Sequence, residues 1–204
     1  MDKKKIYRLS ITAILIAIIA IMAFTPVGYL KIGLLSITFL TVPIIIGAVS
    51  NGPVVGGILG LAFGLTSFAQ CFGMDAFGTA LFQISPFKTA LMCIVPRVLI
   101  GVVCGFVYKG MSKTKAPKPV QYAISAFSAP LTNTVLFMGL LVAFFWNSDY
   151  IQSVATSFGA SGAIMKFLIA MVGVNGIVEL AVCTVLGTVI LIPLEKAVQK
   201  YIIK

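Results

Sequence analysis

Histidine is absent from the 204-residue sequence, and charged side chains are scarce: 10% of residues are charged and five are acidic. The chain therefore lacks the side chain that most often serves as a general base and as a metal ligand. The sequence also contains no GxxxxGK[ST], HExxH or GxSxG motif. These absences argue against a P-loop nucleotide site and against an intramembrane hydrolase. We expect no catalytic residue, no metal and no cofactor.

Cysteine is present but sparse. The four residues, Cys71, Cys93, Cys104 and Cys183, show no CxxC spacing, and most lie inside apolar runs. We interpret them as small buried hydrophobic residues and not as a disulfide framework or a metal site.

Apolar residues make up 60% of the chain. A soluble domain carries about 25% charged residues, so this composition indicates a chain whose main solvent is lipid. The net charge of +10 does not indicate a nucleic-acid partner, because the basic residues form short clusters at the ends of apolar runs. We predict one membrane domain over residues 1–204.

Six apolar segments reach the length of about 17–25 residues that a helix needs to cross a bilayer, and the last two exceed it. We place them at 8–27, 34–50, 53–72, 89–108, 120–146 and 167–194. The second and third are separated by Asn51 and Gly52, which favour a tight turn. We predict an all-α integral membrane protein, a six-transmembrane-helix bundle. Five or seven spans remain alternatives.

The basic residues set the orientation. With the N-terminus inside, eleven are cytoplasmic, in the clusters 3–8, 109–118 and 196–204, whereas Lys31, Lys88 and Lys166 lie outside. This asymmetry predicts cytoplasmic N- and C-termini by the positive-inside rule. It also leaves two long external loops, 73–88 and 147–166. Each is interpreted either as a functional lid or as a plain connector.

Small residues recur four apart in three of the predicted spans. Gly56, Gly60 and Gly64 share one helix face, and Gly101 and Gly105 share another. Such faces let helix backbones approach closely, so we expect tight packing within the bundle.

The first predicted span repeats the pattern with Ala13 and Ala17. That face either packs within the bundle or forms a docking surface for another membrane subunit.

Four polar residues lie within the later spans: Arg97, Asn133, Asn175 and Glu179. Such groups are costly in lipid and face the bundle interior or a wet cavity. We predict that they line one cavity that opens outward and contact a ligand. An arginine there suits a carboxylate or phosphate, because its guanidinium makes bidentate hydrogen bonds. The alternative is a structural Arg97–Glu179 pair with amide hydrogen bonds between helices.

Two prolines lie inside the same spans. Pro96 and Pro130 leave the carbonyls of Met92 and Ala126 without their helical donors. Those carbonyls need other partners, from neighbouring groups, water or ligand.

Several stretches together resemble the substrate-binding S components of energy-coupling factor (ECF) vitamin transporters, most nearly the pantothenate-specific branch. The stretches are 28–30, 47–67, Val95-Pro96-Arg97 with the following 98–101, 107–108, and Leu131-Thr132-Asn133-Thr134 with Gly139. They are spread over most of the chain.

The resemblance implies a six-helix fold in a bacterial plasma membrane, with an external pocket capped by the loop after the first helix and by later external loops. It implies that Arg97 and Asn133 contact the vitamin, and we include Thr132 beside them. It also implies that Ala13 and Ala17 dock on a shared transmembrane scaffold subunit that carries two ABC ATPases.

The sequence therefore predicts a binding subunit that captures pantothenate, or a similar small anionic vitamin, for ATP-driven uptake. Pantothenate offers a carboxylate to Arg97, and an amide and hydroxyls to Asn133 and Asn175; Glu179 fits an anion poorly. One alternative is an S component for riboflavin, a folate or hydroxymethylpyrimidine. Another is a self-sufficient secondary transporter or channel. An enzyme is the most distant alternative.

Overall fold

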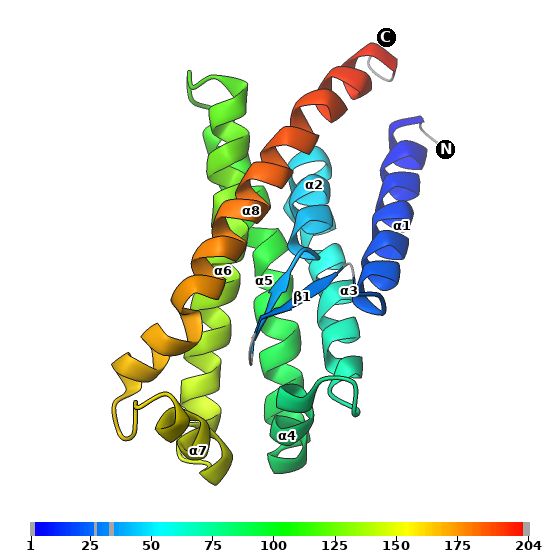
Figure 1. Ribbon diagram of the computed structural model, residues 1–204. Coiled ribbons are helices and arrows are strands. Elements are labelled where there is room, and N and C mark those ends of the chain that lie inside the picture. The colour runs from blue at the N-terminus through cyan, green and yellow to red at the C-terminus, as the bar shows by residue number, and fades with distance from the viewer. Residues whose placement is uncertain (1–2, 27, 33–34, 202–204) are drawn as a thin grey trace.

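The computed structural model describes residues 3–26, 28–32 and 35–201 (Figure 1). Its elements follow in the order α1 (Lys3–Ala23), β1 (Tyr29–Ile32), β2 (Leu35–Thr38), α2 (Thr41–Asn51), α3 (Pro53–Gln70), α4 (Ala76–Ile84), α5 (Pro86–Met111), α6 (Lys118–Phe145), α7 (Asp149–Ser157) and α8 (Ile164–Tyr201).

The long helices form a bundle whose two ends differ. Figure 1 shows that α1 begins and α8 ends at the same end of the molecule, whereas α4 and α7 lie at the opposite end. Within the described residues, five segments are long and apolar enough to cross a membrane: most of α1, the whole of α3, α5 and α6, and Gly176–Leu194 of α8. These confirm the predicted helical membrane bundle.

The predicted span at 34–50 is wrong in form. Its first residues, Leu35–Thr38, form β2, which pairs antiparallel with β1, and only the remainder forms the 11-residue helix α2. Figure 1 shows this hairpin crossing the middle of the bundle. Pairing between the two strands satisfies backbone groups that would otherwise be costly at this depth. The segment therefore adds a short hairpin to the predicted helical fold.

The glycines of α3 and α5 pack as predicted. A Cβ on Gly56 would collide with the backbone of Gly101, and a Cβ on Gly60 would collide with the carbonyl of Arg97. Gly105 in turn lies against the backbone of Pro53. The two helices approach at backbone contact, which holds Arg97 at a fixed place beside α3.

The predicted span at 167–194 is interrupted. Helix α8 is broken at Gly173, whose backbone is not helical (φ 19°, ψ −132°). The apolar segment long enough to cross a membrane begins after the break, at Gly176. Glycine tolerates such a conformation because it has no Cβ.

Both predicted external loops contain a short helix. The side chain of Asp75 accepts a hydrogen bond from Gly78 N at the start of α4, and that of Ser148 accepts one from Ile151 N at the start of α7. These N-caps fix where each helix begins. The ring centroids of Phe77 and Tyr150 lie 6.0 Å apart, so α4 and α7 meet.

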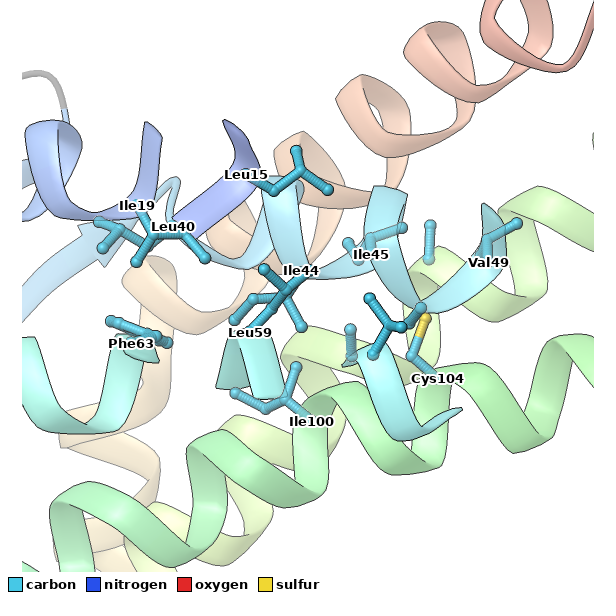
Figure 2. Close-up of a cluster of buried hydrophobic side chains, with 14 of the residues drawn as sticks. Leu15, Ile19, Leu40, Ile44, Ile45, Val49, Leu59, Phe63, Ile100 and Cys104 are labelled. Atoms are coloured by element: carbon cyan, nitrogen blue, oxygen red, sulfur yellow. The ribbon is translucent and has the colours of Figure 1, made fainter. Parts of the chain in front are cut away.

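The main hydrophobic cluster surrounds α2. Figure 2 shows Ile44 and Leu59 at its centre, with Ile100 of α5 pointing toward them and Leu15 of α1 above. All four residues belong to the same buried cluster, and α2 therefore lies inside the bundle although it is short. The outward faces of the helices around α2, including those of α1 and α8, expose large apolar side chains such as Ile14, as a lipid environment requires.

Candidate ligand cavity

A cavity of about 620 Å³ lies between the hairpin and helices α1, α3, α4, α5, α6 and α8. Ligand pockets in proteins are typically about 300–1,000 Å³. Most of its wall is apolar or aromatic, with a few polar side chains among them. Its size and chemistry therefore suit a small organic molecule.

Arg97 of α5 provides the cation among the described residues of the cavity wall. Its guanidinium carbon lies 4.7 Å from the ring centroid of Phe137 and 5.5 Å from that of Phe63, which are cation–π distances. Its Nη1 donates a 3.0 Å hydrogen bond to Met92 O. Pro96 has no N–H to donate to Met92 O, the carbonyl four residues earlier. The hydrogen bond from Arg97 supplies the missing donor. This arrangement fixes the guanidinium plane.

The same arginine retains unused hydrogen-bonding capacity. Arg97 is 9% exposed, and its Nε has no hydrogen-bond partner in the protein. A buried donor of this kind is costly unless something else satisfies it. Because Arg97 lines the cavity, its unsatisfied Nε belongs to the cavity wall.

Three further buried polar atoms in the cavity wall also lack a protein partner: the hydroxyl of Tyr29, Oδ1 of Asn133 and Oε1 of Glu179. They come from β1, α6 and α8, so three distant segments supply them. Together with Arg97 Nε, these atoms provide both hydrogen-bond donors and acceptors without a protein partner in the residues of one cavity wall. A ligand with complementary groups would satisfy them.

Charge in the cavity is mixed. Arg97 and Glu179 share it without forming an ion pair in the described structure, which argues against the structural pair considered above. A second carboxylate, that of Asp75, lies in the wall but accepts the α4 N-cap hydrogen bond. The guanidinium is therefore not neutralised by a bonded carboxylate and can accept an anionic group.

The remaining predicted site residues are placed differently. Thr132 lies on α6 beside Asn133, but its hydroxyl donates to Ser128 O and the residue is not part of the cavity wall; Thr134 is. Asn175 lies in α8 two residues after Gly173, and its side chain falls outside the described residues. The structure therefore brings together three of the five predicted ligand contacts.

Ala13 and Ala17, predicted for docking, are both exposed on α1. The neighbouring Leu15 and Ile19 are buried and pack inward. The small-residue face is therefore not used for packing within this chain.

Sequence reasoning did not single out Tyr29 and Gln70 as cavity residues. Tyr29 belongs to the stretch 28–30 that resembles the family, but nothing in the sequence places it on a hairpin. Gln70 ends α3 and lines the cavity, and its Nε2 donates to Ala23 O at the end of α1. The sequence signal for Gln70 is a polar amide side chain at the end of an apolar segment.

No group of three or more His, Cys, Asp or Glu side chains that could hold a metal ion occurs among the residues that the structure describes. The polar groups of the cavity instead suit an organic ligand that carries an anionic end and hydroxyl or amide groups.

Two comparisons bear on this cavity. The family model described as "ECF transporter, substrate-specific component" matches residues 7–191. The chain is also 28% identical to the Pantothenic acid transporter PanT of Lactococcus lactis subsp. cremoris (strain MG1363), over 97% of this chain and 98% of that protein. The similarity extends over the whole bundle, including every helix that lines the cavity.

Proposed function

Because this chain belongs to the substrate-specific components of ECF transporters, which makes it a multi-pass protein of the bacterial plasma membrane, we propose that it captures pantothenate. The relative from Lactococcus lactis is named as a pantothenic acid transporter. Pantothenate carries one carboxylate, one amide and two hydroxyls, and the cavity offers one unpaired cation with an amide, a phenol and a carboxylate around it.

One observation carries the proposal. Four residues from four separate elements line one cavity, and each has a buried polar atom without a protein hydrogen-bond partner: Tyr29, Arg97, Asn133 and Glu179. Unsatisfied buried groups are rare in folded proteins because each costs free energy, so their convergence needs an explanation. A bound vitamin that accepts from Arg97 and exchanges hydrogen bonds with Tyr29, Asn133 and Glu179 provides it.

The proposal includes six membrane crossings with both ends in the cytoplasm. The hairpin and α2 together would make the second crossing, in addition to the five long apolar segments. The common location of the beginning of α1 and the end of α8 supports an even number of crossings (Figure 1). The cavity, near α4, then opens to the outside.

The chain would act with partners and would itself catalyse no reaction. Family membership implies an ECF module, in which a shared transmembrane scaffold and two ABC ATPases supply ATP hydrolysis. The exposed face around Ala13 and Ala17 is proposed as the surface that contacts the scaffold.

Arg97→Ala tests the site directly. We expect it to weaken pantothenate binding by roughly 10- to 100-fold, because hydrogen bonds to charged groups contribute about 1.5–3 kcal/mol. Isothermal titration calorimetry on purified protein measures this change. Lys166→Ala is the matched control, because it removes an exposed positive charge outside the cavity wall and should leave affinity unchanged.

Unchanged affinity in a folded Arg97→Ala protein would show that the arginine is structural. Mass spectrometry of ligand released from the purified protein tests the identity of the vitamin: riboflavin, a folate or hydroxymethylpyrimidine in place of pantothenate would refute the specificity. Uptake by the isolated chain in liposomes, driven by an ion gradient without ATPases, would establish a secondary transporter instead.

A further inference from the structure

Two cysteine thiols face each other in the wall of the cavity. Sγ of Cys71, at the end of α3, lies 3.8 Å from Sγ of Cys93 on α5, and both cysteines are free. Both residues are only 3% exposed, yet both line the cavity. The two thiols therefore belong to the wall of the cavity and not to the outer surface of the protein.

We propose that Cys71 and Cys93 form a reversible oxidation site, at which a peroxide converts the two thiols into a disulfide across the cavity wall. One sulfur, as its thiolate, attacks the peroxide, forming a sulfenic acid and releasing hydroxide, which leaves as water with the thiol proton. The second sulfur attacks the sulfenic sulfur, forming the S–S bond and releasing a second water. The two thiols together lose two electrons, and hydrogen peroxide is reduced to two waters.

The two sulfurs are already close to each other. A disulfide requires the sulfurs to approach to about 2.05 Å, so the two side chains must close less than 2 Å by rotation. The flanking backbones are already in contact, because a Cβ on Gly64 would meet the carbonyl of Cys93. The thiols are thus held together by the glycine packing of α3 and α5.

The other two cysteines do not share these properties. Cys104 donates from its Sγ to Ser125 O and Cys183 donates to Thr38 O. Neither lines the cavity. They serve as internal references, because both are buried free thiols of the same protein that lie outside the cavity wall.

The bridge would also fix one side of the cavity. Cys71 lies against Gly78 of α4, and the segment between them contains Asp75 of the cavity wall. A bond from Cys71 to Cys93 would tie this turn to α5. By removing conformational freedom from the unfolded chain it should raise the unfolding temperature by on the order of 5 °C.

The test uses the full-length chain, purified in detergent and treated with hydrogen peroxide. After denaturation and alkylation, peptide mapping by mass spectrometry should show a Cys71–Cys93 disulfide, with Cys104 and Cys183 alkylated. A reductant should restore four alkylated cysteines. Cys71→Ser and Cys93→Ser should each abolish the bridge and the rise in unfolding temperature, whereas Cys183→Ser should preserve both.

Four free thiols after treatment, a bridge between any other pair, or irreversible oxidation of one thiol alone would each overturn the proposal. A second arm links it to the proposed function: pantothenate at ten times its dissociation constant should slow bridge formation about tenfold by occupying the cavity. A bridge that forms at the same rate with pantothenate present would count against that ligand and leave the oxidation site established.

Discussion

Tyr29 and Tyr122 have the same unmet hydrogen-bonding requirement in different surroundings. Each has a buried hydroxyl without a protein partner, but only Tyr29 lines the cavity. Tyr122 lies in the hydrophobic cluster and stacks on Tyr108, with ring centroids 5.7 Å apart. Removing each hydroxyl in turn therefore distinguishes the loss of a ligand contact from the general effect of removing a buried hydroxyl.

We predict that Tyr29→Phe weakens pantothenate binding by about 2- to 13-fold, the equivalent of roughly 0.5–1.5 kcal/mol for one neutral hydrogen bond. Ligand-free stability should not fall, because the variant removes an unsatisfied buried group. Calorimetric titration and thermal unfolding measure the two quantities. Tyr122→Phe should leave affinity unchanged; equal losses in both variants would indicate an indirect effect of packing.

The inward position of Arg97 could be predicted from sequence, because the residue is charged and lies well inside an apolar span. A cation within an apolar span must face the interior, and Pro96 beside it identified the carbonyl that needed a donor. Thr132 could not be resolved in this way. Its hydroxyl bonds to the preceding turn of its own helix, a common alternative for threonine that sequence does not distinguish from a ligand contact.

At the scale of elements, hydropathy predicted the four longest uninterrupted helices, α1, α3, α5 and α6. It failed where one apolar segment contains both a strand and a helix. Residues 34–50 average as a span, but Leu35–Thr38 alternates apolar and polar residues and pairs with Tyr29–Ile32. A window long enough to detect a membrane helix conceals a four-residue strand. The N-caps Asp75 and Ser148 were present in the sequence, and reading them as helix starts would have predicted α4 and α7.

The contact between α3 and α5 gives a prediction at this scale. Gly101→Ala should lower the free energy of unfolding by about 1–3 kcal/mol, because the new Cβ meets the backbone of Gly56 and the helices must separate. Affinity for the ligand should fall as well, since Arg97 lies one turn away on the same helix face. Thermal or denaturant unfolding in detergent measures the first effect.

Gly139→Ala is the matched control, because a Cβ there meets nothing within 4 Å. Replacing a helical glycine by alanine in open space should be neutral or stabilise the fold by about 0.5–1 kcal/mol. If both variants lost the same stability, the cause would be the removal of glycine itself and not the close approach of the two helices.

For the whole molecule, variants at the exposed Ala13 and Ala17 of α1 test whether vitamin binding and transport depend on different surfaces. Ala13→Leu or Ala17→Leu should leave pantothenate affinity intact, because neither residue lines the cavity. Uptake should fall to near background, because a larger side chain prevents close approach of a scaffold helix. Vitamin uptake by cells that express the complete transporter, compared with binding to the purified chain, measures both.

Ile14→Leu provides the volume-conserving control on the same exposed surface and should transport normally. Normal uptake by the alanine variants would show that α1 faces lipid in the assembled transporter and that another surface meets the scaffold.

The hydrogen bond from Gln70 to Ala23 O connects the end of α3 to the end of α1. Gln70 and Ala23 both line the cavity, and Ala23 ends the helix that presents Ala13 and Ala17. A vitamin that shifts the Gln70 amide therefore acts on α1 itself. If α1 contacts the scaffold as proposed, thermodynamic reciprocity applies: by whatever factor the vitamin changes the affinity of α1 for the scaffold, the scaffold changes the affinity of the cavity for the vitamin. Vitamin binding and docking would then be one coupled equilibrium.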